Sequence, residues 1–179
     1  MPTEKWNFKK FFPTDSNYVC RFIEESFVKS SKGNPMIVLQ PEIVSPAEVN
    51  NGQETLNIAG TKPAKMYFNT KVLDEDGNIV QDKTDSAAKR IEQLYTALEL
   101  DFTDFNPDNP TLAFKGKTFY CMIQCEEDAQ RKNPTPDQIK KGERGDTMKN
   151  PVTGKDLITY KPVVREVFGL AQVGAGASY

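Results

Sequence analysis

The chain has 179 residues, with 23 Lys and Arg against 25 Asp and Glu and a net charge of −2. This length suits one domain with a substantial core, and no apolar run approaches the roughly eighteen residues that a membrane span needs. The chain contains no histidine, so the most common general base is missing and we expect no enzymatic activity. The start, MPTEKW, does not have the pattern of a signal peptide, so we expect a cytoplasmic protein.

The three cysteines predict neither a disulfide framework nor a metal centre. Cys121 and Cys125 are four residues apart, and Cys20 is remote from both. A zinc site would lack a histidine to complete its four ligands, whereas cysteines commonly serve as small apolar core residues. We therefore expect reduced thiols, no metal and no cofactor.

The first sixteen residues, 1–16, form an N-terminal arm that interleaves aromatic rings with lysines. Two interpretations are open for this arm. The rings of Phe8 and Phe11 plug one end of the core, or the arm offers rings and charges to a partner. The residues assigned to the second interpretation are Trp6, Lys9, Lys10 and Phe12.

The next segments read as three strands. Residues 17–28 and 36–44 are rich in β-branched and aromatic side chains and are separated by a turn with Gly33, so they predict a hairpin. A polar loop follows over 45–63. Residues 64–73 then alternate most regularly, which predicts a third strand with Lys65, Tyr67 and Lys71 on its polar face.

One helix and two further strands complete the expected domain. The segment TDSAAKRIEQLYTALEL repeats apolar residues at three and four, with Thr84, Asp85 or Ser86 as its N-cap. Residues 115–127 and 157–170 predict the fourth and fifth strands, joined by a long loop over 128–156. The tail, 171–179, is small and flexible in composition.

Three strands, one helix and two strands are the element order of an OB-fold. We therefore predict a mainly β protein: a five-stranded, OB-fold-like antiparallel barrel over 17–170, with one α-helix between strands 3 and 4. A β-sandwich with one helix is the alternative architecture. An OB-fold binds ligands along strands 2 and 3 and through the loops that join strands 1–2 and 4–5.

The loop between the fourth and fifth strands is strongly basic. From Arg131 to Lys155 the chain has seven Lys or Arg and three acids, although the whole protein is slightly acidic. Lysines beside aromatic rings suit a single nucleic-acid strand, since rings stack on bases and ammonium groups contact phosphates. Outside the arm, the candidate DNA-binding residues are Arg21, Lys32, Lys65, Tyr67, Lys71, Tyr120, Arg131, Lys132, Lys140, Lys141, Arg144, Lys149 and Tyr160.

The segment KSSKGNPMIVLQPEIV, residues 29–44, is similar to the lysine–glycine turn and second strand of compact single-stranded DNA-binding proteins of bacteriophages. This resemblance, with the element order, implies sequence-independent coating of exposed strands in phage replication, recombination or repair, in the bacterial cytoplasm. It also implies replication or recombination proteins as partners. However, many such proteins end in an acidic tail, and this chain ends in GLAQVGAGASY.

Two other function classes remain open. The chain fits a non-enzymatic phage structural or protein-interaction module that forms oligomers through its arm. A nuclease would need clustered acids near a basic groove, for which Glu126, Glu127 and Asp128 are the candidates. We expect no membrane partner in either case.

Overall fold

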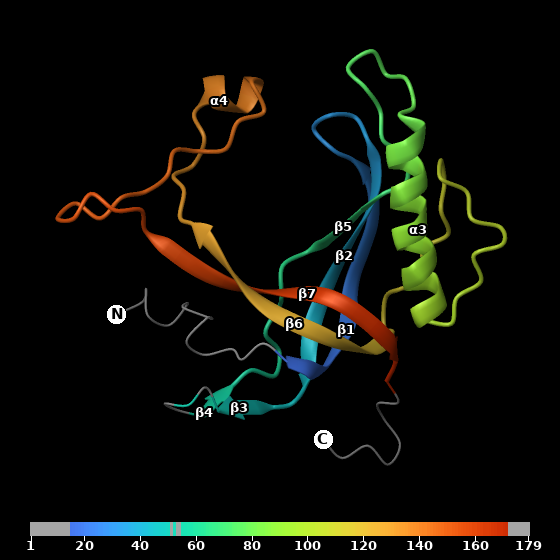
Figure 1. The fold of residues 1–179 in the computed structure, drawn as a ribbon, viewed down its shortest axis with the longest axis horizontal. Coiled ribbons are helices and arrows are strands. Elements are labelled where there is room, and N and C mark those ends of the chain that lie inside the picture. Colours follow the sequence, from blue (N-terminus) through green and yellow to red (C-terminus); the bar gives the residue numbers. More distant parts are fainter. Residues whose placement is uncertain (1–14, 51, 53–54, 172–179) are drawn as a thin grey trace.

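The computed structural model describes residues 15–50, 52 and 55–171. Its main feature is a five-stranded sheet in the order β5-β2-β1-β6-β7, in which every pair of neighbours is antiparallel (Figure 1). The protein is therefore mainly β, as expected. The strands are β1 (Asp15–Lys29), β2 (Pro35–Ser45), β5 (Met66–Asn69), β6 (Thr118–Ala129) and β7 (Ile158–Leu170).

The β1–β2 pair is the hairpin that the sequence predicts. Its register runs from Val19 opposite Ser45 to Lys29 opposite Pro35. Gly33 adopts φ 85° in the turn, a conformation that side chains other than glycine's disfavour. Its amide donates to the carbonyl oxygen of Ser30 at 2.8 Å, which closes the turn.

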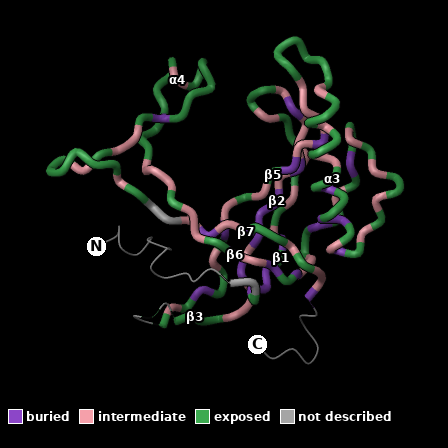
Figure 2. The backbone as a smooth tube through the Cα atoms, in the orientation of Figure 1, coloured by how far each residue is buried: buried purple, intermediate pink, exposed green. Residues whose placement is uncertain are grey.

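The core lies between one face of the sheet and the helix α3 (Gln81–Ala97). Alternation places Phe22, Ile37 and Phe119 on this face, and each is almost fully buried. The rings of Phe22 and Phe119 lie 4.4 Å apart. Figure 2 shows the buried residues concentrated where the strands cross and along α3.

The helix begins earlier than its sequence predicts. Val80 is the N-cap residue and provides no side-chain hydrogen bond, so the expected capping by Thr84, Asp85 or Ser86 is wrong. Instead, the hydroxyl oxygen of Thr84 accepts a hydrogen bond from the Val72 amide at 3.0 Å. This contact ties the first turn of α3 to the segment that follows β5.

The sheet is not closed into a barrel, contrary to the expectation. The edge strands β5 and β7 are linked near one end, where the Ala64 amide donates to the carbonyl oxygen of Pro162 at 3.0 Å. Further along, a cavity of 340 Å³ lined by β5, α3 and β7 separates the two edges. The reason is the length of β5: the expected strand over 64–73 pairs with β2 only from Met66 to Asn69.

Three short elements were not expected. The polar stretch 45–63 contains a small hairpin made of β3 (Glu48–Asn50) and β4 (Thr55–Asn57). The connection between β6 and β7 contains α4 (Pro136–Lys140), whose N-cap Thr135 and third residue Gln138 form a reciprocal capping box. Short elements of this kind have too few residues to show a period in the sequence.

The chain ends fall largely outside the described residues. Of the arm expected over 1–16, Asp15 begins β1 and residues 1–14 are not described. Of the tail expected over 171–179, Ala171 is described: it is buried and its amide donates to the carbonyl oxygen of Thr118 at 3.0 Å. In the described part of the chain, no helix has the length and apolar character required to cross a bilayer.

Candidate nucleic-acid interface

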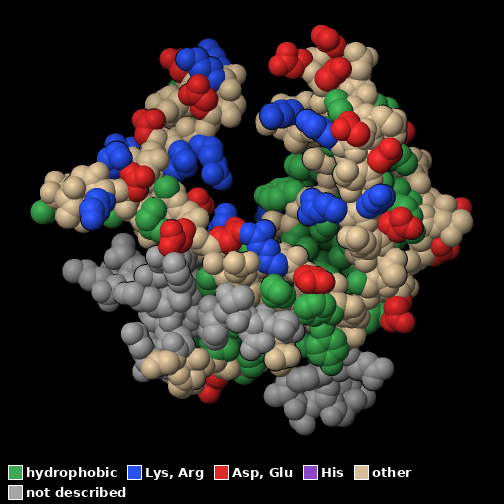
Figure 3. Space-filling view, in the orientation of Figure 1, with side chains coloured by type: hydrophobic (Ala, Val, Ile, Leu, Met, Phe, Trp, Pro, Cys, Tyr) green, Lys and Arg blue, Asp and Glu red, His purple; other side chains and the backbone are tan. Residues whose placement is uncertain are grey.

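A hollow lies between two projections of the molecule. One projection is the connection between β6 and β7, residues 130–157, which we call the basic excursion; the other is the β1–β2 hairpin. In Figure 1 the excursion and α3 lie on opposite sides of this hairpin. Figure 3 shows the hollow in the molecular surface, with lysine and arginine side chains on both of its sides.

On the hairpin side, the hollow is lined by the face of β1, β2 and β5 that is turned away from α3. Tyr67 of β5 pairs with Val38 of β2, which pairs with Ser26 of β1. Their chain neighbours Ile37 and Phe68 are buried on the core side, so alternation directs the Tyr67 ring away from the helix. Tyr67 is 53% exposed, which leaves its ring available for stacking.

We call this face, with Ser26, Val38 and Tyr67 side by side, the Tyr67 platform. Three other predicted residues flank it. Lys65 is exposed and precedes β5 by one residue, on the same side as Tyr67 by alternation. Arg21 is exposed on β1 and forms a weak ion pair with Glu42, at 4.0 Å between Nη2 and Oε1. Tyr120 of β6 is 46% exposed and pairs with Val19, which places it on the same outer face as Arg21.

The basic excursion is ordered by its own hydrogen bonds. The Lys132 amide donates to the carbonyl oxygen of Asp146 at 2.8 Å, and the Met148 amide donates to that of Gln130 at 2.7 Å. The Arg131 guanidinium donates to the carbonyl oxygen of Gly145 at 3.1 Å. Arg131, one of the predicted DNA-binding residues, is exposed, and its Nη1 also links the two sides of the excursion.

The cations of the excursion fall into two groups. Lys149 is paired with Asp156 at 2.6 Å, so its charge is partly neutralised. The exposed cations for which no described residue provides an ion pair are Arg131, Lys132, Lys140, Lys141, Arg144 and Lys155. Across the hollow, Lys29 ends β1 and Lys32 lies in the turn that follows, both exposed. Exposed positive charges therefore lie on both sides of the hollow, on the excursion and on the hairpin (Figure 3).

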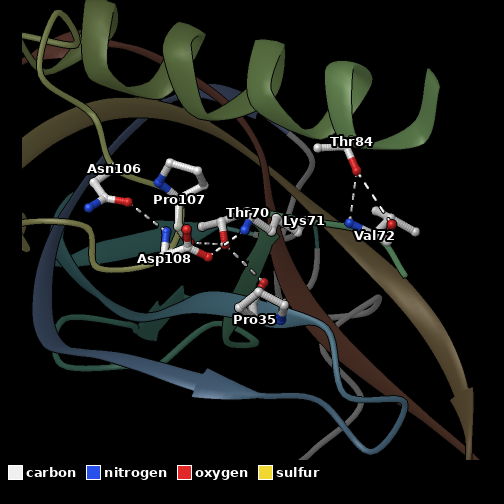
Figure 4. A network of polar contacts seen from close by, with 8 residues as sticks. All are labelled: Pro35, Thr70, Lys71, Val72, Thr84, Asn106, Pro107 and Asp108. Atoms are coloured by element: carbon white, nitrogen blue, oxygen red, sulfur yellow. Dashed lines mark hydrogen bonds and ion pairs between the residues drawn. The ribbon is translucent and has the colours of Figure 1, made fainter. Parts of the chain in front are cut away.

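Lys71 is not part of this face. It lies beyond the end of β5 and forms an ion pair with Asp108, and its Nζ is the donor (Figure 4). Next to it, the buried Thr70 hydroxyl donates to the carbonyl oxygen of Pro107 at 2.8 Å. The prediction that Lys65, Tyr67 and Lys71 share one strand face is therefore wrong for Lys71, because the chain leaves the strand at Thr70.

Some predicted residues cannot be placed. Trp6, Lys9, Lys10 and Phe12 lie outside the described residues, and so does the side chain of Tyr160. Conversely, Val38 lies on the platform and was missed. Its signal was the run MIVL in 36–39, which has more consecutive apolar residues than a strand with one buried face requires.

The thiols provide no reactive group. Cys121 Sγ lies 3.6 Å from Cys20 Sγ, and both residues are buried. The contact with Cys121 and burial raise the pKa of the Cys20 thiol, and burial raises the pKa of Cys125 to about 12. At neutral pH these two side chains are therefore protonated and poor nucleophiles. Within the described ranges, no three Cys, Asp or Glu side chains are grouped to hold a metal ion.

Comparison with known proteins gives no match to a protein-family model, a curated protein or a solved structure.

Proposed function

We propose that the protein binds single-stranded DNA without sequence preference and without catalysis. The observation that carries the proposal is the exposed Tyr67 platform beside a hollow with cations on both sides. A ring that stacks on bases and cations that contact phosphates are the two components of single-strand binding. The physiological role that fits is the coating of exposed strands during phage replication, recombination or repair in the bacterial cytoplasm.

The strand order supports an OB-type architecture for this function. In an OB barrel, strand 1 pairs with strands 2 and 4, and contact between strands 3 and 5 closes the sheet. Here β1 pairs with β2 and β6, and β5 and β7 are the edges that would meet. We propose an OB-type sheet that is open between these edges, with α3 as the helix between its third and fourth strands and the excursion as its loop between strands 4 and 5.

The test is anisotropy of fluorescently labelled oligo(dT) at two salt concentrations. Phosphate contacts release counterions, so we expect affinity to fall steeply with salt. The slope of the logarithm of the binding constant against the logarithm of the salt concentration is expected to be about −0.7 for each phosphate contact. The double variant Lys140→Ala, Lys141→Ala is expected to make this slope less negative by the contribution of about one to two phosphate contacts. Lys83→Ala is the matched control, because Lys83 is exposed on α3. A wild-type protein that binds no oligonucleotide at low salt disproves the proposal.

A protein-interaction module is the second candidate function. It is favoured by a groove of 430 Å³ between α3 and β7, beside which Phe168 is 46% exposed. An exposed ring in a groove is a common anchor for a protein partner or a second copy of the chain. In that case Phe168→Ser would dissociate an oligomer seen by light scattering and leave oligonucleotide binding unchanged.

A further inference from the structure

A second cavity lies between the end of the β1–β2 hairpin and the connection from β5 to α3. Its volume is 640 Å³, within the range of about 300–1,000 Å³ that is common for small-molecule sites. Its walls are mainly apolar. Val28 and Ile79, at 43% and 50% exposure, are the most exposed of these apolar residues.

The cavity also has a fixed polar edge. Lys71 and Asp108 line it and are paired with each other. The Asp108 amide donates to Asn106 Oδ1 at 2.9 Å, and Thr70 joins this loop to β2 through the carbonyl oxygens of Pro107 and Pro35 (Figure 4). An ammonium donor and a carboxylate acceptor are therefore held side by side at the edge of an apolar space.

The cavity borders the Tyr67 platform at Val28, whereas Phe27 lines it from the core side of β1. Val28 lies two residues beyond Ser26 in β1 and pairs with Met36, whereas Ser26 pairs with Val38. Residues two apart in a strand share a face, so Val28 extends the platform toward the cavity. Lys29, which also lines the cavity, is an exposed cation at this border.

We propose that this cavity holds one base of the bound strand, as a subsite beyond the Tyr67 platform; this inference rests on the proposed function. A nucleobase has two apolar faces and an edge that carries donors and acceptors. Val28 and Ile79 contact the faces, and the Lys71–Asp108 pair contacts the edge. Lys29 contacts the phosphate between this base and the next one toward the hollow.

The experiment compares binding of short and long oligo(dT) to Val28→Asp and Ile79→Asp. A short oligonucleotide is held by the platform alone, whereas a longer one also reaches the cavity. Each variant is expected to weaken binding of the long oligonucleotide about five- to tenfold or more, the usual effect of losing one stacked base. The short oligonucleotide keeps its wild-type affinity. Phe168→Asp is the control, because Phe168 is 46% exposed, lies on β7 outside the basic excursion and does not line the cavity.

A second readout is photocrosslinking of the long oligonucleotide with 5-bromodeoxyuridine, followed by peptide mapping. A crosslink within 27–35 or 71–79 supports the subsite. Variants whose circular dichroism is unchanged and which bind both lengths like the wild type overturn it, and so does an equal loss for both lengths. In either case the proposed function stands, since the wild type still binds. A wild type that binds neither length defeats both proposals.

Discussion

At Gly145 the carbonyl oxygen of Lys132 lies 1.7 Å from the position that a Cβ atom would occupy. Real Cβ atoms do not approach another atom so closely, and the obstacle is backbone, which cannot rotate away. Gly145 is buried and accepts the hydrogen bond from Arg131. One residue without a side chain therefore allows the two sides of the excursion to meet.

Gly145→Ala is expected to cost about 3 kcal/mol or more of local stability, because the backbone must move to relieve the overlap. The matched control is Gly154→Ala. Gly154 has φ 69° with open space around it. Alanine at position 154 therefore has only the cost of a left-handed backbone conformation, about 1–2 kcal/mol. Hydrogen exchange at the Lys132 amide measures the difference. Equal protection in both variants would contradict the importance of the close contact.

Tyr67→Ala is expected to lower affinity for oligo(dT) by the loss of one stacked base, about 1–3 kcal/mol. Tyr67→Phe retains the ring and is expected to bind like the wild type. Because Tyr67 is half exposed, its removal changes the folded core little, and thermal unfolding is expected to remain near the wild-type temperature. Anisotropy and melting curves of both variants test this. Equal losses for Ala and Phe would show that the ring does not stack.

Cys125 makes stability depend on alkaline pH. Its folded pKa of about 12 exceeds the ordinary value of 9.0 because the thiol is half buried. As pH rises, the unfolded chain loses this proton before the folded protein does. The contribution of Cys125 to the free energy of unfolding is therefore complete below pH 9.0 and is lost as pH rises toward about 12. Cys125→Ser is expected to reduce the fall in unfolding free energy between neutral and strongly alkaline pH, measured with urea. Identical falls in both proteins would contradict this.

At the scale of elements, the excursion leaves the sheet and returns to it at one place. Ala129 is the last residue of β6 and pairs with Ile158, the first residue of β7. Replacement of 130–157 by Asn-Gly would therefore connect the strands by a two-residue hairpin turn. We expect the sheet to fold, and binding to lose affinity and much of its salt dependence, since seven lysines and arginines are removed. An unchanged salt slope would exclude the excursion from the interface.

The sequence predicts these elements where periodicity is strong. The alternation in 64–73 predicts the strand that is present at Met66–Asn69, and the three- and four-residue repeat of Ile91, Leu94 and Tyr95 predicts α3. The sequence could not predict where β5 ends, because this end depends on the hydrogen bond from Thr70 to Pro107, thirty-seven residues away. The partner of Lys71 is equally remote. Contacts between distant residues leave no local pattern.

At the scale of the whole molecule, charge is distributed unevenly. The net charge is −2, yet the excursion from Arg131 to Lys155 carries four more basic than acidic residues. Uneven charge of this kind concentrates positive potential in one place on a slightly acidic protein. The pattern of charge was visible in the sequence, whereas the hollow that receives it required the arrangement of β1, β2 and the excursion in space.

Bound oligonucleotide is expected to stabilise the whole fold. A ligand at about a hundred times its Kd adds about 2.7 kcal/mol to the folded state, which corresponds to about 5–10 °C in a domain of this size. Differential scanning fluorimetry with oligo(dT) measures the shift, which is expected to shrink in high salt. Duplex DNA at the same nucleotide concentration is the control, since its stacked bases cannot reach Tyr67. An equal shift with duplex would contradict recognition of unpaired bases.

The hydrogen bond between Ala64 and Pro162 has a consequence for engineering. In a β-strand the amide and carbonyl of one residue point to the same side, so the nitrogen of position 162 faces the same edge as the carbonyl oxygen that accepts from Ala64. Proline has no N–H to donate, and the rung is therefore one-sided. Pro162→Val would supply the missing donor at the seam and lengthen the pairing between the outermost strands. A single substitution thus separates the contribution of this proline from that of the short β5 in keeping the two edges apart.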